Sequence, residues 1–212
     1  TLSSEDNEKW VEIKNKTYIY NPLSFFTDKV SDCNSKQVIA VGRYTYQKGF
    51  DMLIRSWKIV NEKHSDWVLK IYGGGERRDY IKLRDSIGLD KNVILETSTD
   101  NIIEKYCESS IFVLSSRFEG FGMVITEAMA CGVPAVSFEC PCGPRDIIND
   151  GEDGLLVENG DIEQLAEKIC YLIENEEIRK EMGRKARVNV EIFRLENIGR
   201  QWEEMFDELL SK

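Results

Sequence analysis

Histidine is nearly absent from this sequence of 212 residues, in which His64 stands alone. A Ser-His-Asp or Cys-His mechanism needs an imidazole beside a nucleophile, so the sequence offers almost no material for either. His64 follows Glu62 and Lys63 at the end of a predicted helix, where a cation at the C-terminus is its ordinary role. No Asp-X-Asp motif occurs, so a carboxylate-bound metal on a diphosphate has no predicted site.

Long apolar runs and clusters of basic residues are missing as well. No run of about 18 apolar residues occurs, so no transmembrane helix is predicted. The start of the chain has neither the basic nor the apolar part of a signal peptide, and the missing initiator Met predicts a fragment. The net charge of -10 argues against a nucleic-acid partner, because phosphate backbones need clustered cations. An anionic ligand would therefore be held locally, by a few cations and backbone amides.

The six cysteines follow neither a disulfide pattern nor a metal-binding one. Four of them stand among apolar neighbours, as buried thiols do: Cys33, Cys107, Cys131 and Cys170. Cys140 and Cys142 are two positions apart, and no second pair or nearby histidine completes a zinc site. We therefore expect no metal, and we expect a reducing, cytoplasmic location.

What the sequence does contain is an alternation of strand-like and helix-like segments. Six short apolar runs predict buried strands: Val38–Val41, Val68–Tyr72, Val93–Leu95, Ile111–Leu114, Ala135–Phe138 and Leu155–Val157. Helices are predicted between them at Phe50–Lys63, Tyr80–Ile87, Ile102–Cys107, Gly122–Cys131 and Arg145–Asn149. This order predicts an α/β fold with a Rossmann-like, doubly wound, six-stranded parallel sheet. Ligands of such sheets bind at the carboxyl ends of the strands.

The two ends of the chain have a different pattern. Beyond Asn159 the sequence predicts helices alone: Ile162–Glu174, opened by a capping box of Asp161 and Gln164, then about Glu176–Val190 and about Glu196–Leu210. The first residues predict a helix over Ser4–Ile13 and a short strand at Tyr18–Tyr20. Asn21 and Pro22 then indicate a connector into the domain.

The segment richest in chemistry follows the fourth predicted strand and reads Ser-Ser-Arg-Phe-Glu-Gly-Phe-Gly from Ser115. Gly120 and Gly122 let the backbone approach a ligand closely. The helix that follows offers unpaired N–H groups and the positive end of its dipole. A diphosphate needs this combination.

Glu127 is the only charged residue between Gly120 and Phe138, on a helix that is apolar nearly all round. Such a helix should be buried, and an unpaired buried carboxylate costs several kcal/mol, so Glu127 should have a partner. A ribose fits, because its 2′- and 3′-hydroxyls can both donate to one carboxylate. A structural ion pair with Arg43 or Arg117 is the alternative, and the residue types do not separate the two.

Three further charged residues are predicted at the same edge of the sheet. Glu119, in the loop before the helix, can accept bonds from sugar hydroxyls or stabilise positive charge at an anomeric carbon; alternatively it only complements the helix N-terminus. Arg43 ends the first strand after Gly42, and Lys48 precedes a helix. Two cations there can neutralise a pyrophosphate, although a surface lysine needs no such role.

Weaker features complete the predicted rim of the cleft. Gly73-Gly74-Gly75-Glu76 follows the second strand, but Arg78 stands where G-x-G-x-x-G needs its last glycine. A tight turn is therefore expected rather than a dinucleotide fingerprint. Cys140-Pro141-Cys142-Gly143-Pro144-Arg145 follows the fifth strand and should also border the cleft. The candidate rim residues are Gly73, Gly74, Arg117, Gly143 and Arg145.

Three stretches together resemble the group-one (family four) retaining glycosyltransferases: VGRYTYQKGFDMLI (Val41–Ile54), SSRFEGFGMVITEAMACGVPAV (Ser115–Val136) and GPRDIINDGEDGLLVENGD (Gly143–Asp161). The resemblance implies a GT-B fold, in which two Rossmann-like domains face a cleft. The C-terminal domain would bind the sugar nucleotide and the N-terminal one the acceptor. Transfer would retain the anomeric configuration without a metal or a cofactor, the nucleotide sugar being a co-substrate.

The resemblance also implies roles for individual residues. Glu127 would hold the donor ribose. The catalytic residues would be Glu119, which contacts the sugar, and Arg43 and Lys48, which bind the diphosphate. The implied donor-binding set is Gly42, Arg43, Lys48, Glu119, Gly120, Phe121, Gly122, Met123, Val124 and Glu127.

By the same resemblance, residues 1–22 are a remnant of the acceptor domain together with the interdomain connector. Residues 23–192 form the donor domain, and residues 193–212 form a helix that crosses back toward the acceptor domain. We expect the fragment to be inactive alone. We expect a hexose to pass from UDP-galactose, UDP-N-acetylgalactosamine or UDP-glucose to a saccharide or lipid-linked acceptor in bacterial surface polysaccharide assembly. Cys140–Pro144 resembles the C-P-x-G-P of bacterial enzymes of that class, which implies one of the first two donors. Peripheral membrane association of the full-length enzyme stays open.

Three other functions are alternatives to this one: a UDP-N-acetylglucosamine 2-epimerase-like enzyme, a non-catalytic sugar-nucleotide-binding module and a nicotinamide-dependent dehydrogenase. The dehydrogenase is weakened by the failed glycine fingerprint.

Overall fold

A computed structural model describes residues 1–211 and contains one sheet of six parallel strands, in the order β3-β2-β1-β4-β5-β6. The strands are β1 (Gln37–Val41), β2 (Val68–Tyr72), β3 (Val93–Glu96), β4 (Ile111–Leu114), β5 (Ala135–Phe138) and β6 (Gly154–Val157). All six predicted strands are confirmed. The order reverses between β1 and β4, and at such a switch point the loops diverge and leave a crevice at the carboxyl ends of the strands.

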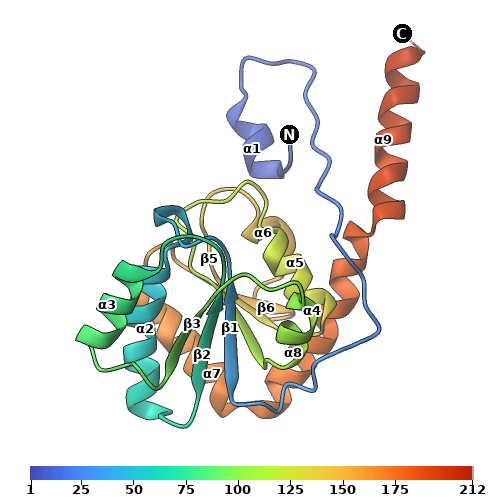
Figure 1. The fold of residues 1–212 in the computed structure, drawn as a ribbon. Helices are drawn as coiled ribbons and strands as arrows, with labels where there is room; N and C mark the ends of the chain where they lie inside the picture. Colours follow the sequence, from blue (N-terminus) through green and yellow to red (C-terminus); the bar gives the residue numbers. More distant parts are fainter. Residues whose placement is uncertain (212) are drawn as a thin grey trace.

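Helices cover both faces of the sheet (Figure 1). On one face lie α2 (Phe50–Lys63), α3 (Arg78–Ser86) and α7 (Ile162–Glu174), packed on one apolar core. The other face carries α4 (Ile102–Cys107), α5 (Met123–Ala130) and α8 (Glu176–Asn189), with a second core. Because β4 and β5 are buried from both sides, they read as continuous apolar runs rather than alternating ones.

The short elements at the crevice differ slightly from their predicted bounds. The helix predicted at Gly122–Cys131 is α5, with Gly122 as a left-handed N-cap at φ 97°. The one predicted at Arg145–Asn149 is a single turn, α6 (Pro144–Ile147), with proline at its start. A 3₁₀ turn, η1 (Tyr46–Lys48), precedes α2. Asp161 caps α7 through the Gln164 N–H at 2.8 Å, but Gln164 accepts from Glu158 instead of completing the capping box.

Two predictions for the N-terminal segment are wrong. The helix predicted to reach Ile13 is α1 (Ser4–Lys9), which buries no residue and therefore lacks the packing that would extend it. Tyr18–Tyr20 forms no strand. The Tyr18 and Tyr20 rings pack on each other, and the Tyr20 ring also packs on Phe121, but no strand lies beside this segment within the described residues.

At the other end of the chain, α8 leads through a 3₁₀ turn, η2 (Val190–Phe193), into α9 (Leu195–Leu210). The long α9 projects beyond the sheet on the side where α1 lies (Figure 1). Ile198 is its one buried residue, whereas Trp202, Phe206 and Leu209 are exposed. Residue 212, with which the predicted third segment ends, lies outside the described residues. From 1 to 211, no helix has both the length and the apolar composition that a membrane span requires.

Candidate functional site

Two clefts lie at the carboxyl ends of the strands. The first, the Glu127 cleft, has a volume of about 290 Å³ and is lined by Val41, Gly42, Arg43, Tyr72, Gly73, Gly74, Ser98, Thr99, Ile102 and Glu127. The second, the Glu119 cleft, measures about 270 Å³ and is lined by Leu2, Asn21, Lys48, Glu119, Gly120, Phe121, Gly122, Met123 and Val124. Helix α5 contributes to both clefts. Together they contain every residue of the predicted donor-binding set.

The floor of the Glu127 cleft consists of backbone from the ends of β1 and β2. The Gly42 N–H donates to the Tyr72 carbonyl at 3.0 Å, and the Tyr44 N–H donates to the Gly74 carbonyl at 2.8 Å. A Cβ on Gly73 would lie 1.7 Å from the Gly42 oxygen. Glycine at 73 therefore lets the two loops meet, which is the tight turn expected from the sequence.

Glu127 points from α5 into this cleft and is held by two hydroxyl groups. Its Oε1 accepts from Ser24 at 2.6 Å, and its Oε2 accepts from Tyr106 at 3.0 Å. Tyr106 is fully buried, and burial together with the Glu127 charge holds the pKa of its hydroxyl well above the usual range. That hydroxyl is therefore protonated at neutral pH and donates to Glu127.

The alternative of an ion pair for Glu127 is wrong. Arg117 binds Asp51 with both guanidinium nitrogens, at 2.9 and 2.7 Å, and its guanidinium carbon stacks 3.9 Å from the centre of the Tyr46 ring. Arg43 is exposed at the cleft and has no ion pair with any of residues 1–211. Glu127 thus carries its charge with hydroxyl partners and keeps part of its surface toward the cleft.

Lys48 and Glu119 form an ion pair in the second cleft. The distance from Lys48 Nζ to Glu119 Oε1 is 2.7 Å, and the two side chains are only 15% and 7% exposed. Ser116 also donates to Glu119 Oε1, at 2.6 Å. The Lys48 stem lies over Gly42, where a Cβ would be 3.0 Å from Lys48 Cδ. The sequence placed both residues at this edge, but it did not predict that they bind each other.

The start of α5 borders the same cleft. Met123 and Val124 occupy the first turn of the helix, after Gly122. Backbone N–H groups in a first turn have no partner within the helix, and the positive end of the helix dipole adds to their attraction for anions. An anion in the Glu119 cleft would therefore meet both these N–H groups and the Lys48 ammonium.

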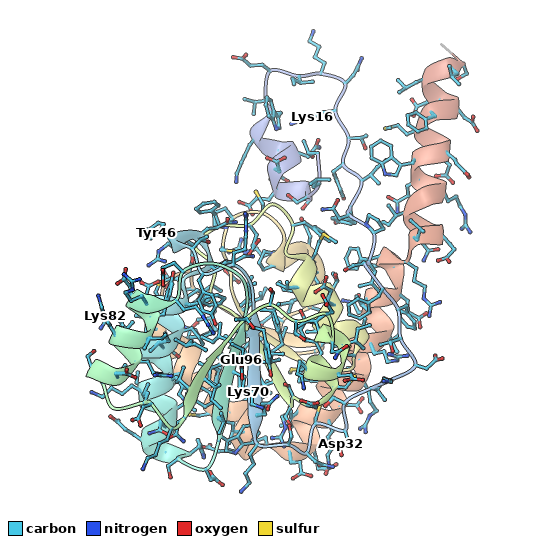
Figure 2. The ribbon with its side chains drawn as sticks, viewed as in Figure 1. Lys16, Asp32, Tyr46, Lys70, Lys82 and Glu96 are labelled. Carbon is cyan, nitrogen blue, oxygen red and sulfur yellow. The ribbon has the colours of Figure 1, made fainter. Side chains whose placement is uncertain are left out.

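The predicted rim residues separate into two groups. Gly73 and Gly74 line the Glu127 cleft, and Gly143 packs so closely on the Phe121 carbonyl that a Cβ would lie 1.7 Å from its oxygen. Arg117 and Arg145 line neither cleft and instead form ion pairs with Asp51 and Glu139. Tyr46, which Arg117 covers, lies at the upper rim of the sheet in Figure 2, opposite Asp32 at the lower end.

Several residues in or beside the two clefts were not predicted. Ser24 and Tyr106, which hold Glu127, come from the segment before β1 and from α4. Ser98, Thr99, Leu2 and Asn21 line the clefts from loops or from the N-terminal segment. A lone hydroxyl or amide in a loop has no pattern that marks it, so only the folded chain identifies these residues. Over residues 1–211, no group of three or more His, Cys, Asp or Glu side chains could hold a metal ion.

Comparisons with known proteins agree on one family. The model of the family "Glycosyl transferases group 1" matches residues 25–189. An uncharacterised glycosyltransferase of Haemophilus influenzae is 32% identical over 207 residues, with 95% of this chain and 59% of that protein aligned. A poly(ribitol-phosphate) alpha-N-acetylglucosaminyltransferase of Staphylococcus aureus is 32% identical over 209 residues, which cover 97% of this chain and 41% of that one. The chain thus spans about half the length of these two relatives.

Solved structures match as well. The crystal structure of S. aureus TarM has a TM-score of 0.88 at 29% identity and covers 97% of this chain and 42% of its own. A second TarM structure, a variant in complex with UDP among other ligands, also has a TM-score of 0.88 at 29% identity, with coverage of 97% and 43%. A sucrose-phosphate synthase from Thermosynechococcus elongatus reaches the same TM-score at 24% identity, covers 100% of this chain and 58% of its own, and shows the fold alone. The predicted fold class is confirmed.

Proposed function

We propose, from the premise that this chain belongs to the group 1 glycosyl transferases and forms the C-terminal, Rossmann-like half of a GT-B fold, that its two clefts bind a UDP-sugar as donor. The single observation that carries the proposal is the set of contacts around Glu127. Its carboxylate is fixed by two hydroxyl donors, has no cation partner among residues 1–211, and faces a cleft. The family favours a transferase over the epimerase and the dehydrogenase.

The Glu127 cleft suits the nucleoside. An ionised carboxylate has about four lone-pair positions for hydrogen bonds, of which Ser24 and Tyr106 use two. The remaining positions can accept from the vicinal hydroxyls of a ribose. Because Tyr106 is buried and protonated, the carboxylate is oriented before the nucleotide arrives, which lowers the entropic cost of binding.

The diphosphate would lie between the two clefts. Arg43 has no ion-pair partner within the described part of the chain, so it can bind a phosphate without breaking an existing contact. Lys48 would move from Glu119 toward the phosphates, and the first N–H groups of α5 would add donors. Glu119, released from Lys48, would then accept from the donor sugar's hydroxyls.

The same arrangement supports transfer with retention. Cleavage of the bond between the anomeric carbon and the phosphate leaves negative charge on the diphosphate and positive charge on the sugar. Arg43, Lys48 and the α5 amides would stabilise the first, and Glu119 the second. The acceptor hydroxyl would attack from the face on which the nucleotide departs, and its proton would pass to the departing diphosphate oxygen.

The acceptor and the biological context follow from family likeness. We infer a saccharide or lipid-linked acceptor and a role in bacterial surface polysaccharide assembly. A relative 32% identical over 188 residues is an amylovoran biosynthesis glycosyltransferase of Erwinia amylovora. In this proposal residues 1–22 end the acceptor-binding half and connect it, residues 23–192 form the donor half, and residues 193–212 cross back. The exposed aromatic side chains of Trp202 and Phe206 on α9 would then meet that half.

Calorimetric titration with UDP, GDP and ADP tests the donor site. We expect UDP to bind, and we expect Glu127→Ala to weaken its binding about 10- to 100-fold, because hydrogen bonds to a charged group are lost. Glu177→Ala, which removes an exposed carboxylate on α8, is the matched control and should leave the affinity unchanged. Absence of binding by any of the three nucleotides at millimolar concentration would contradict the donor site. Transfer activity of the 212 residues alone would contradict the need for an acceptor half.

A further inference from the structure

The loop after β5 rests directly on the backbone of the Glu119 cleft. The Glu119 N–H donates to the Pro141 carbonyl at 3.0 Å. Two residues later in the loop, Gly143 touches the Phe121 carbonyl at a distance that only a glycine allows, with φ 118°. The positions of Glu119 and Phe121, which line the cleft, therefore depend on where this loop lies.

The loop is in turn tied to the N-terminal segment at two points. Asp146, at the far side of Gly143, accepts from the Ser4 N–H at 3.0 Å and also from the Ser4 hydroxyl. On the near side, the Cys142 N–H donates to Glu5 Oε2 at 2.8 Å. This bond lowers the pKa of the Glu5 carboxyl, which is also paired with Lys9 at 3.1 Å.

The loop backbone between these two points is strained. Cys142 has a φ of 67°, which is uncommon for a residue with a side chain, and Gly143 follows it in the same half of conformational space. A conformation of this kind persists only where neighbouring contacts hold it. Besides the contacts with Glu119 and Phe121, the contacts that hold it are those with Ser4 and Glu5. The N-terminal segment therefore helps the loop to keep the shape that supports Phe121.

The N-terminal segment also closes the cleft itself. Leu2 and Asn21 line the cleft together with Glu119 and Phe121. In Figure 1, α1 lies above the edge of the sheet, close to α6. Tyr20, just before Asn21, packs on Phe121 with ring centres 5.5 Å apart. The segment before and within the connector thus covers the cleft on one side and holds its supporting loop on the other.

We propose that Asp146 is a positioning residue for donor-sugar recognition. By binding Ser4 it holds the start of α6 and the preceding loop 139–143, and through this loop the Glu119–Phe121 backbone, in the arrangement that accepts a sugar. Asp146 lines neither cleft, so it acts through the loop rather than on the ligand. The proposal rests on the proposed donor site. It adds that sugar recognition depends on the N-terminal segment, whereas binding of the nucleoside in the Glu127 cleft does not.

Hydrogen exchange without ligand tests the loop coupling on its own. In Asp146→Asn, one of the two donors on Ser4 faces an amide NH₂ in place of a carboxylate oxygen, so the contact weakens. We expect the Glu119 amide to exchange about tenfold faster than in the wild type. Glu152→Gln, an exposed carboxylate in the next loop, is the control and should not change this rate. An unchanged Glu119 amide in Asp146→Asn would overturn the proposal, whether or not the chain binds nucleotides.

Titration calorimetry then separates the sugar from the nucleotide. The probes are UDP and the tightest binder among UDP-glucose, UDP-galactose and UDP-N-acetylgalactosamine. We expect Asp146→Asn to leave UDP affinity within about twofold and to weaken UDP-sugar binding about tenfold. Ser4→Ala, a milder change, should weaken UDP-sugar binding in the same direction and add little in the double variant, because the two residues act through one contact. Equal losses for UDP and UDP-sugar would overturn the positioning role. A wild-type chain that binds no nucleotide would instead contradict the donor site.

Discussion

Glu119 and Lys48 neutralise each other in the free protein, at 2.7 Å and with little exposure to solvent. In the proposed donor site, a donor would therefore exchange one ion pair for another: the diphosphate would bind Lys48, and the sugar's hydroxyls would replace the ammonium at Glu119. UDP without a sugar would separate the pair and provide no sugar hydroxyls to donate hydrogen bonds to Glu119. We therefore expect the pair to favour the sugar nucleotide over the free nucleotide.

Glu119→Gln should increase the affinity for UDP by about three- to tenfold, because Lys48 is then free for the phosphates without breaking an ion pair. The same change should weaken the preference for a UDP-sugar over UDP. Titration calorimetry with both ligands measures the two effects. The reciprocal variant Lys48→Met should lose UDP affinity and about 3 kcal/mol of stability, since the Glu119 carboxylate stays buried without its cation. A decrease in UDP affinity in Glu119→Gln would show that the pair does not compete with the diphosphate.

Among the elements, the ends of β1 and β2 determine the shape of the Glu127 cleft. They meet through backbone alone, because neither Gly42 nor Gly73 has a side chain to separate them. Neighbouring Gly74 lines the same cleft, yet no atom lies within 4 Å of the position of its missing Cβ. Substitutions at Gly73 and Gly74 can therefore be compared to test whether the contact between the loops shapes the cleft.

Gly73→Ala should destabilise the protein by about 1–3 kcal/mol and weaken UDP binding, because a methyl group on the Gly42 oxygen forces the two strand ends apart. Gly74→Ala should change the stability by less than about 0.5 kcal/mol. Urea denaturation gives the free energies of unfolding, and calorimetry with UDP gives the affinities. Equal effects of the two substitutions would mean that the contact between the loops does not shape the cleft.

For the whole molecule, the buried and half-buried tyrosines predict how stability changes at alkaline pH. Burial raises the pKa of Tyr20, Tyr44, Tyr72, Tyr80 and Tyr106 above the usual value. The folded state thus keeps protons that the unfolded chain loses at about pH 10. Since the unfolded state then binds fewer protons, the stability from these groups is complete below about pH 10 and is lost as the pH rises toward the folded pKa values.

We therefore expect the free energy of unfolding to fall steadily above about pH 10. Tyrosinate absorbance of the folded protein should stay below that of the chain in urea at the same pH. Titration by ultraviolet absorbance, with circular dichroism to follow the fold, measures both quantities. Coincident absorbance curves for the folded and unfolded chain would show that these hydroxyls are not buried in solution.

Much of the fold could be predicted because its signals are local. The six strands are apolar runs between turn residues, and buried parallel strands have that composition wherever they occur. The prediction for the first residues failed for the same reason: Tyr18–Tyr20 consists of residues that favour strands, but no neighbouring strand lies beside it within the described chain. A strand is defined by its partner, and the partner is not local.

Glu127 shows which properties of the site the sequence determined and which the tertiary structure decided. Composition along one helix was enough to determine that this carboxylate needs a partner, and the order of strands and loops was enough to place Arg43, Lys48 and Glu119 at one edge of the sheet. Only the tertiary structure decided the pairing: Ser24 and Tyr106 on Glu127, Lys48 on Glu119, and Ser4 on Asp146. The physical reason is the separation along the chain between the residues that interact. Strand and helix formation depend on neighbours along the chain, whereas hydrogen bonds and ion pairs act over about 3 Å between residues that the fold brings together from distant positions.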